Sequence, residues 1–387
     1  MYQPAGRQFP NLAFLWPAFA AASVSEMAAE AARGFAALAV GSDASKRPEP
    51  NWVTPHVVAL ELHTTRLHDF TTGTNGTAAL LCAPFALHGA TLADFAPGHS
   101  LVAALRRTGL QRLFLAECRS ASADMRFLGI DDYLADLNVL VDEIGAPADL
   151  IGLCQGGWMA LIYAARFPEK VRKLVLAGAP IDTAAAASAL SMLAGAAPAA
   201  IFHELVRLGG GLVTGREVLK FWGPETVTAE DVRQVLQTDE PCDSAAFAQL
   251  EALFQRWYAW TVDLPGQFFL EAVEKLYMRN EIASGTFVAL GERIDLARVT
   301  APAFLLAARD DELVAPPQLL AAAHLLGTHA GNLRTAVAPC RHLSLFMGKA
   351  VLEGFWPAIV CWLADQRAVG RGGAHDVPRG TAAPRAM

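Results

Sequence analysis

A cysteine framed by glycines constrains the fold of this chain more than any other feature. Leu150 to Leu153 form a short apolar run suited to a buried strand, and residues 159–167 predict a helix that ends before Pro168. Between them lies Gly152-Leu153-Cys154-Gln155-Gly156-Gly157, whose glycines allow strand and helix to approach closely. The pattern predicts a sharp strand-to-helix turn with the thiol at its apex. The N-terminus of the following helix favours negative charge on a thiolate or an oxyanion.

Composition limits the kinds of partner that this chain can have. With 53 % hydrophobic residues among 387, it can bury one large α/β domain or a domain with an insertion. A formal net charge of -7, without stretches that alternate basic and aromatic residues, argues against nucleic acid. Six scattered cysteines show neither a C-x-x-C pair nor zinc spacing, so we predict no disulfide framework, no metal and no cofactor.

The same pattern of cysteines favours a reducing, cytoplasmic location. No apolar run is long and uninterrupted enough to span a bilayer. The apolar run at residues 12–24 resembles a weak signal-peptide core, although the acidic residues after it favour an amphipathic helical arm. Arm and signal peptide therefore both remain open for the N-terminal segment.

The order of apolar runs and helical patterns predicts an α/β fold with a mostly parallel, doubly wound sheet, because β-α-β units need right-handed crossovers that cover both faces. Strands are expected as a pair within 55–70, then at 78–84, 112–117, 150–153, 171–177, 303–308 and 333–338; helices are expected at 97–108, 130–144 and 351–364. We divide the chain into a helical arm and linker (1–50), an α/β core (51–182 and 286–366), an inserted helical cap (183–285) and a disordered tail (367–387).

Three groups at the ends of predicted strands point to nucleophilic catalysis. The thiol of Cys154 needs a base to take its proton, and His342 follows the last strand. Asp311 follows the preceding strand and is expected to accept the other imidazole N–H; Asp310 and Asp182 are its rivals. The chain order nucleophile, acid, histidine is that of the α/β-hydrolases.

Further residues are expected around this triad. Backbone N–H groups of Gln155 and of Phe85 or Ala86 are expected to form the oxyanion hole. The tryptophans Trp158, Trp257 and Trp260 are expected to bind the substrate, although a packing role is the simpler interpretation for any single aromatic residue of the cap. The histidines at 56, 63 and 68 match no usual metal site, and we interpret them as ordinary core or surface residues.

Over roughly residues 54–364 the chain resembles the polyhydroxyalkanoate enzymes. The glycine-framed box looks most like the smaller, two-subunit class of synthases, together with Tyr163-Ala164-Ala165 and Phe167-Pro168-Glu169-Lys170-Val171. Other segments look like the intracellular depolymerases, namely Ala83-Pro84, His88-Gly89-Ala90-Thr91-Leu92, Val262-Asp263-Leu264-Pro265, Phe268-Phe269-Leu270, Asp310-Asp311 and His342-x-x-x-Phe346-x-Gly348. The resemblance implies an α/β-hydrolase fold in which Cys154 carries the acyl group and Asp311 and His342 complete the triad.

Three positions depart from these patterns. Gly156 stands where depolymerases usually carry proline, and Glu312 and Arg341 stand where synthases usually carry histidine and glycine. We therefore expect a thiol enzyme acting on esters or thioesters of 3-hydroxyalkanoic acids, with depolymerase-like hydrolysis slightly ahead of polymerisation of 3-hydroxyacyl-CoA. The expected partner is a hydroxyalkanoate ester, polymer or acyl-CoA; granule association and a homo-oligomer stay open. The alternative of another class is a non-catalytic granule-surface or subunit-binding protein.

Overall fold

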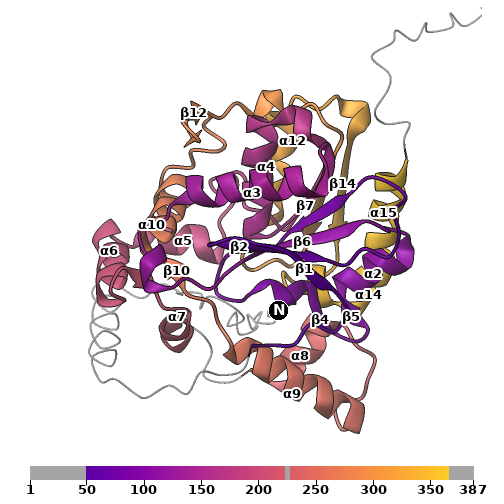
Figure 1. Ribbon diagram of the computed structural model, residues 1–387. Coiled ribbons are helices and arrows are strands. Elements are labelled where there is room, and N and C mark those ends of the chain that lie inside the picture. Colours follow the sequence, from indigo (N-terminus) through magenta and orange to yellow (C-terminus); the bar gives the residue numbers. More distant parts are fainter. Residues whose placement is uncertain (1–48, 223–226, 366–387) are drawn as a thin grey trace, which may run out of the picture.

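An eight-stranded, mostly parallel sheet forms the centre of the molecule (Figure 1). The computed structural model describes residues 49–222 and 227–365, so nearly all of the expected arm, and the expected tail, lie outside the described residues. In spatial order the strands are β1 (Val57–Glu61), β2 (Thr65–Asp69), β6 (Leu113–Cys118), β3 (Ala79–Cys82), β7 (Ala148–Leu153), β8 (Val171–Ala177), β13 (Ala303–Ala308) and β14 (Leu333–Ala338). Only β2 runs antiparallel to its neighbours. The predicted doubly wound, mostly parallel sheet is confirmed.

Helices cover both faces of this sheet. Alternate residues of the central strands enter two separate hydrophobic clusters, as Leu150 and Ile151 do in β7. On one face lie α3 (Ile130–Ile144) and α4 (Gln155–Arg166); on the other lie α2 (Leu101–Thr108), α14 (Lys349–Gly354) and α15 (Trp356–Ala364) (Figure 1). The central strands β3 and β7 are buried along their whole length, so neither of their faces meets water.

Three expected helices have different bounds in the structure. The first begins at Leu101 rather than near residue 97, because Gly98, at φ +83°, belongs to a short hairpin of β4 (Asp94–Ala96) and β5 (His99–Ser100). The helix after the cysteine begins at Gln155, directly behind the turn. The last helix is divided after Gly354, where α14 ends and α15 begins with Pro357 in its first turn.

Between β8 and β13 the chain leaves the sheet and forms helices. The elements are α5 (Ala189–Ala196), α6 (Ala199–Leu208), β9 (Leu212–Val213), α7 (Gly215–Trp222), α8 (Ala229–Leu236), α9 (Ala245–Ala259), β10 (Leu264–Pro265), α10 (Gly266–Ala272), the π-helical η4 (Val273–Met278), β11 (Val288–Ala289), β12 (Glu292–Arg293) and η5 (Leu296–Arg298). We call the helices from α5 to η4 the cap. Short elements elsewhere are η1 (Ala90–Ala93), η2 (Ala123–Met125), η3 (Pro168–Lys170), α11 (Pro316–Leu320), α12 (Ala322–Leu325), η6 (Ala330–Asn332) and α13 (Ser344–Met347).

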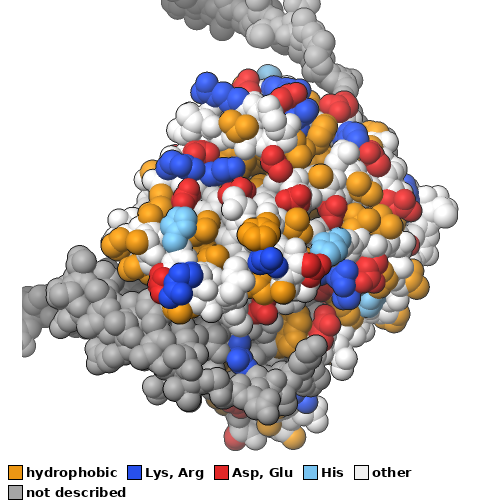
Figure 2. Space-filling model, turned by 60° about the vertical axis from the view of Figure 1, so that its left-hand side comes forward, with side chains coloured by type: hydrophobic (Ala, Val, Ile, Leu, Met, Phe, Trp, Pro, Cys, Tyr) orange, Lys and Arg blue, Asp and Glu red, His pale blue; other side chains and the backbone are white. Residues whose placement is uncertain are grey.

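The surface and the helix lengths bear on possible partners. Figure 2 shows acidic and basic side chains mixed on one face of the molecule rather than gathered in a basic stripe. Among the described residues no single helix is both long and apolar enough to cross a membrane; α5 and α6 meet that test only as a pair, bent by 96°.

His88 fastens the loop after β3 to the cap. The Nδ1 atom of His88 lies 3.1 Å from the Trp260 carbonyl oxygen. A carbonyl oxygen can only accept a hydrogen bond, so Nδ1 carries the proton and donates it. Its ring lies 4.5 Å from the ring of Trp257, measured between centroids. Burial lowers the pKa of His88 to about 4, although the bond to Trp260 acts the other way. The folded protein therefore holds this imidazole neutral.

We predict that acid weakens the folded state through His88. An unfolded histidine titrates near pH 6.5, so the stabilising effect of neutral His88 is complete above that pH and falls as the pH approaches 4. Between pH 7 and pH 5 the loss from this group is about 2 kcal/mol of unfolding free energy. His88→Gln keeps a donor for Trp260 and carries no titrating group. Measured by urea unfolding, its loss of unfolding free energy between pH 7 and pH 5 should therefore be smaller than that of the unaltered protein by about 2 kcal/mol.

The matched control is His63→Gln. The side chain of His63 is 57 % exposed, so this variant should lose stability on acidification as the unaltered protein does. An equal acid loss in all three proteins would show that His88 does not carry the effect.

Candidate active site

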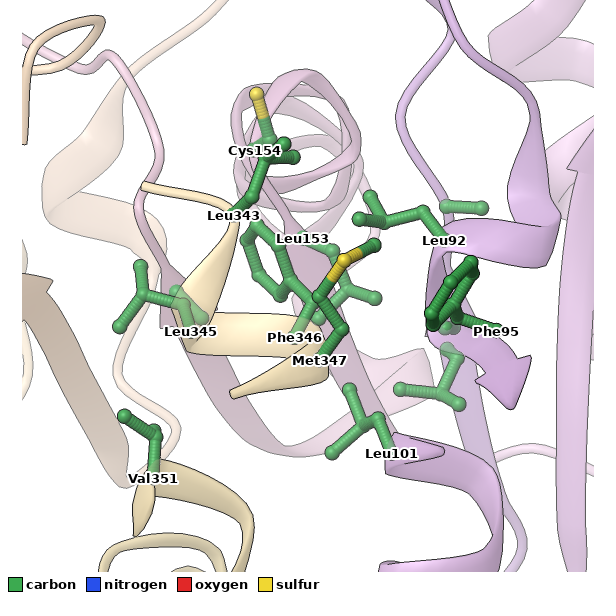
Figure 3. Packing of buried hydrophobic residues seen from close by; sticks show 14 of the residues in the cluster. Leu92, Phe95, Leu101, Leu153, Cys154, Leu343, Leu345, Phe346, Met347 and Val351 are labelled. Carbon is green, nitrogen blue, oxygen red and sulfur yellow. The ribbon is translucent and has the colours of Figure 1, made fainter. Parts of the chain in front are cut away.

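Cys154 occupies a backbone conformation that few residues other than glycine adopt. Its φ is +50° and its ψ is -119°, and it lies between β7 and the first residue of α4. Its N–H donates to the Ala177 carbonyl oxygen at 2.9 Å, and its own carbonyl oxygen accepts from the Gly157 N–H at 2.9 Å. These bonds hold the predicted turn. In Figure 3 the sulfur points away from the cluster that contains Leu153, Phe346 and Met347.

The glycines around the cysteine are required by close backbone packing. A Cβ atom on Gly156 would collide with the carbonyl oxygen of Cys82 in β3, and one on Gly152 would collide with the Cα atom of Gly157. At these glycines the backbone of α4 therefore approaches β3 and β7 without an intervening side chain, as the sequence pattern predicts.

His342 and Asp311 come together behind the thiol. An ionised carboxylate can only accept, so His342 Nδ1 carries the proton and donates to Asp311 Oδ2 at 2.7 Å. The other oxygen, Oδ1, accepts from the backbone N–H groups of Leu313 at 2.9 Å and Val314 at 2.8 Å. The side chains of His342 and Asp311 are 2 % and 0 % exposed. The carboxylate is thus fixed and orients the ring.

The second ring nitrogen of His342 is left for the cysteine. Burial alone would lower the pKa of His342, but the charges of Asp311 and Cys154 raise it well above the usual value. Nε2 is buried and makes no hydrogen bond with any residue in the described ranges. The ring is therefore oriented so that Nε2 can take the proton of the thiol.

The rival carboxylates are engaged elsewhere. Asp310 is 55 % exposed in its side chain and pairs with Arg309, with 3.1 Å between Oδ2 and Nη2. Asp182 accepts hydrogen bonds from the Asn280 side chain at 2.8 Å and the Ala184 N–H at 3.1 Å. Of the three candidate acids, only Asp311 is bonded to His342.

Two residues that depart from the synthase pattern contact each other beside the triad. Arg341 Nε lies 3.7 Å from Glu312 Oε1. Burial raises the pKa of Glu312, while the charge of Arg341 lowers it. Arg341 also donates to Gln234 of α8 at 3.4 Å. The pair therefore joins the loops that carry Asp311 and His342 to the cap.

A pocket of about 90 Å³ opens beside the elbow, between core and cap. Phe85, Ala86 and Gln155, the three residues expected to form the oxyanion hole, all line it. Cys154 itself is not among the lining residues but directly precedes Gln155. The cap side is apolar and includes Leu190, Ala194, Phe202, Phe268, Phe269 and Val273. The space suits an apolar acyl group.

The three tryptophans expected to bind substrate lie outside this lining. Trp158 is fully buried, and its Nε1 donates to Gln155 Oε1 at 2.6 Å. Trp257 is 2 % exposed and packs against His88, and Trp260 lies against Gly89. Their positions indicate packing within the core and the cap, because large aromatic side chains fill such interfaces.

Sequence reasoning missed Tyr277. This residue lines the pocket, and its hydroxyl oxygen accepts from Gln155 Nε2 at 2.9 Å. Burial and the charge of Cys154 raise its pKa, and the bond from Gln155 lowers it. Tyr277 lies in the π-helical η4, and such turns occur often at functional sites. No sequence motif marks a π-helical turn, so the sequence carried no signal for it.

Each of the three neighbouring histidines has a different polar partner. His68 Nε2 lies 2.7 Å from Glu117 Oε2, His63 Nε2 lies 3.1 Å from Asp124 Oδ2, and His56 Nδ1 lies 3.2 Å from the Thr54 carbonyl oxygen. Within residues 49–222 and 227–365, no group of three or more His, Cys, Asp or Glu side chains is arranged to hold a metal ion.

Comparisons with known proteins place this geometry in a family. The family model described as alpha/beta hydrolase fold matches residues 62–348. A poly(3-hydroxyalkanoate) polymerase subunit of Synechocystis sp. is 29 % identical over 289 residues, covering 71 % of this chain and 75 % of that protein. One of Haloferax mediterranei is 22 % identical over 304 residues, covering 72 % of this chain and 56 % of that protein. A monoacylglycerol lipase of Paleococcus ferrophilus superposes with a TM-score of 0.49 at 15 % identity, and the match covers 78 % of this chain and 98 % of that chain.

These comparisons test the expected family, the expected enzyme class and the choice between polymerase and depolymerase. The resemblance to the polyhydroxyalkanoate enzymes and the prediction of an enzyme of the hydrolase or acyltransferase type are confirmed. The relatives favour the polymerase alternative over the depolymerase-like hydrolysis that the sequence analysis placed first. The chain belongs to the α/β-hydrolase fold family.

Proposed function

We propose that this enzyme is a cysteine acyltransferase that moves 3-hydroxyacyl groups from coenzyme A thioesters to the hydroxyl end of a growing polyester. The observation that carries the proposal is the buried hydrogen bond of 2.7 Å between His342 and Asp311, behind a thiol held on a strained turn. The polymerase names of the relatives support an alcohol as the acceptor. A polymer product would keep the enzyme at the granule surface.

Each transfer consists of two steps. His342 takes the proton of the Cys154 thiol, and the sulfur attacks the carbonyl carbon of the substrate thioester. The carbon–sulfur bond to coenzyme A breaks, and coenzyme A leaves as a thiol with the proton from His342. The chain-end hydroxyl then gives its proton to His342 and attacks the Cys154 thioester. A new ester forms and Cys154 leaves as a thiolate.

Backbone groups at the elbow stabilise the tetrahedral intermediates in this proposal. The N–H of Gln155 is the first of α4, and such groups have no acceptor within their own helix. With an N–H of Phe85 or Ala86 it would hold the oxyanion. The apolar wall of the pocket supports transfer to an alcohol, because it disfavours water near the acyl-enzyme.

The proposed function is tested with purified protein and 3-hydroxybutyryl-CoA. We expect release of coenzyme A, an acyl group on Cys154 detectable by mass spectrometry, and insoluble polyester. The acyl-enzyme is the primary measurement, because it forms in the first of the two proposed steps. Soluble hydroxy acid from amorphous polymer granules, without acylation by the thioester, would indicate hydrolysis instead and would overturn the proposal.

Asp311→Asn should lower the rate of coenzyme A release by about 100-fold or more, because an amide favours the wrong imidazole tautomer. The neighbouring Asp310→Asn is the matched control, since that carboxylate is exposed and pairs with Arg309. It should keep the rate within about twofold. Equal losses in both variants would contradict the assignment of Asp311.

Cys154 should react with iodoacetamide faster than the other cysteines at pH 7, and His342→Gln should remove this advantage. Burial raises the pKa of Cys82 and of Cys340 to about 12, so both stay protonated. Cys242 and Cys361 are exposed and serve as internal references for an ordinary thiol. Peptide mass spectrometry after short exposures measures each site. Uniform slow labelling would argue against activation of Cys154 by His342.

A further inference from the structure

Tyr277 contributes the only side-chain hydroxyl to the described lining of the pocket. Gln155 is the other polar side chain there, and the remaining lining residues are apolar. A substrate oxygen that entered such a space would lose its hydrogen bonds to water unless the pocket replaced them. The role of the Tyr277 hydroxyl therefore depends on where its proton points.

The indole of Trp158 determines that direction. An indole N–H can only donate, so the Gln155 atom at 2.6 Å from it must be the amide oxygen. The other amide atom of Gln155 is then the nitrogen, which can only donate. It lies 2.9 Å from the Tyr277 oxygen, so that oxygen accepts and the tyrosine proton is not used in this bond. No residue in the described ranges accepts that proton.

The phenol keeps its proton at neutral pH. Burial is the largest influence on the pKa of Tyr277 and raises it, and the charge of Cys154 raises it further. The hydroxyl is also bonded to Gln155, the residue that directly follows Cys154. A neutral donor therefore lies in the pocket wall, bonded to the residue next to the proposed nucleophile.

We propose that Tyr277 donates a hydrogen bond to the oxygen on the third carbon of the acyl group and so selects 3-hydroxyacyl substrates. This inference rests on the proposed acyl transfer. The carbonyl oxygen has backbone donors of its own at the elbow, so the oxygen on the third carbon is the one polar atom of the acyl chain left to be bound. Gln155 and Trp158 hold the donor in place and act as positioning residues.

The test compares two thioesters that differ only in this oxygen. The rate of the first turnover of coenzyme A release is measured with 3-hydroxybutyryl-CoA and with butyryl-CoA. The unaltered protein should prefer the first, and Tyr277→Phe should reduce the ratio of the two rates about tenfold or more. A general disturbance of the fold slows both substrates alike and leaves the ratio unchanged.

Tyr163→Phe is the matched control. Its hydroxyl donates to Asn138 at 3.1 Å, and the residue does not line the pocket, so the ratio should stay that of the unaltered protein. An unchanged ratio in Tyr277→Phe, or a parallel fall of both rates, overturns the role of Tyr277 while leaving acyl transfer in place. If the unaltered protein releases coenzyme A from neither thioester, the proposed function fails and the inference fails with it.

Discussion

The strained turn at Cys154 is the constraint on which the whole site depends. A residue at φ +50° that is not glycine keeps this conformation only where the surrounding structure fixes it. Here the fixing comes from the burial of α4, in which every residue from Gly156 to Ala165 is buried between the sheet and its neighbours. The free energy gained by burying that much apolar surface greatly exceeds the cost of the strained backbone at one residue, which is on the order of 1–3 kcal/mol. The thiol consequently lies at the N-terminus of a helix that cannot move without disrupting the core.

The cap is attached to the core at the loops that form the site. Arg341 joins the loops of the triad to α8, and His88 joins the loop after β3 to the segment after α9. The bond from Gln155 to Tyr277 joins the elbow itself to η4. The core therefore carries Cys154, His342 and Asp311, and the cap carries the apolar wall of the pocket and the Tyr277 hydroxyl. A change in the cap at any of these contacts acts directly on the geometry around the thiol.

Most of the sheet could be predicted because its signals are local. The strands at 171–177, 303–308 and 333–338 and the helix at 130–144 have the predicted bounds, because the spacing of apolar residues that predicts each one lies within the segment itself. The sequence did not indicate that the three tryptophans lie outside the lining of the pocket. An indole fills a core as readily as it lines a pocket, and nothing in the residue type distinguishes the two positions.

The sequence by itself determined the parallel sheet, the turn at Cys154 and the order in which the acid and the histidine follow it, because each depends on neighbours in the chain. Only the tertiary structure decided between Asp310 and Asp311. Both lie in the turn after β13, where the chain direction depends on long-range packing; Asp310 is exposed and pairs with Arg309, whereas the Asp311 side chain is buried and bonded to His342. It alone also brought Tyr277 to Gln155, since a contact between residues 122 positions apart depends on how the cap folds back over the sheet.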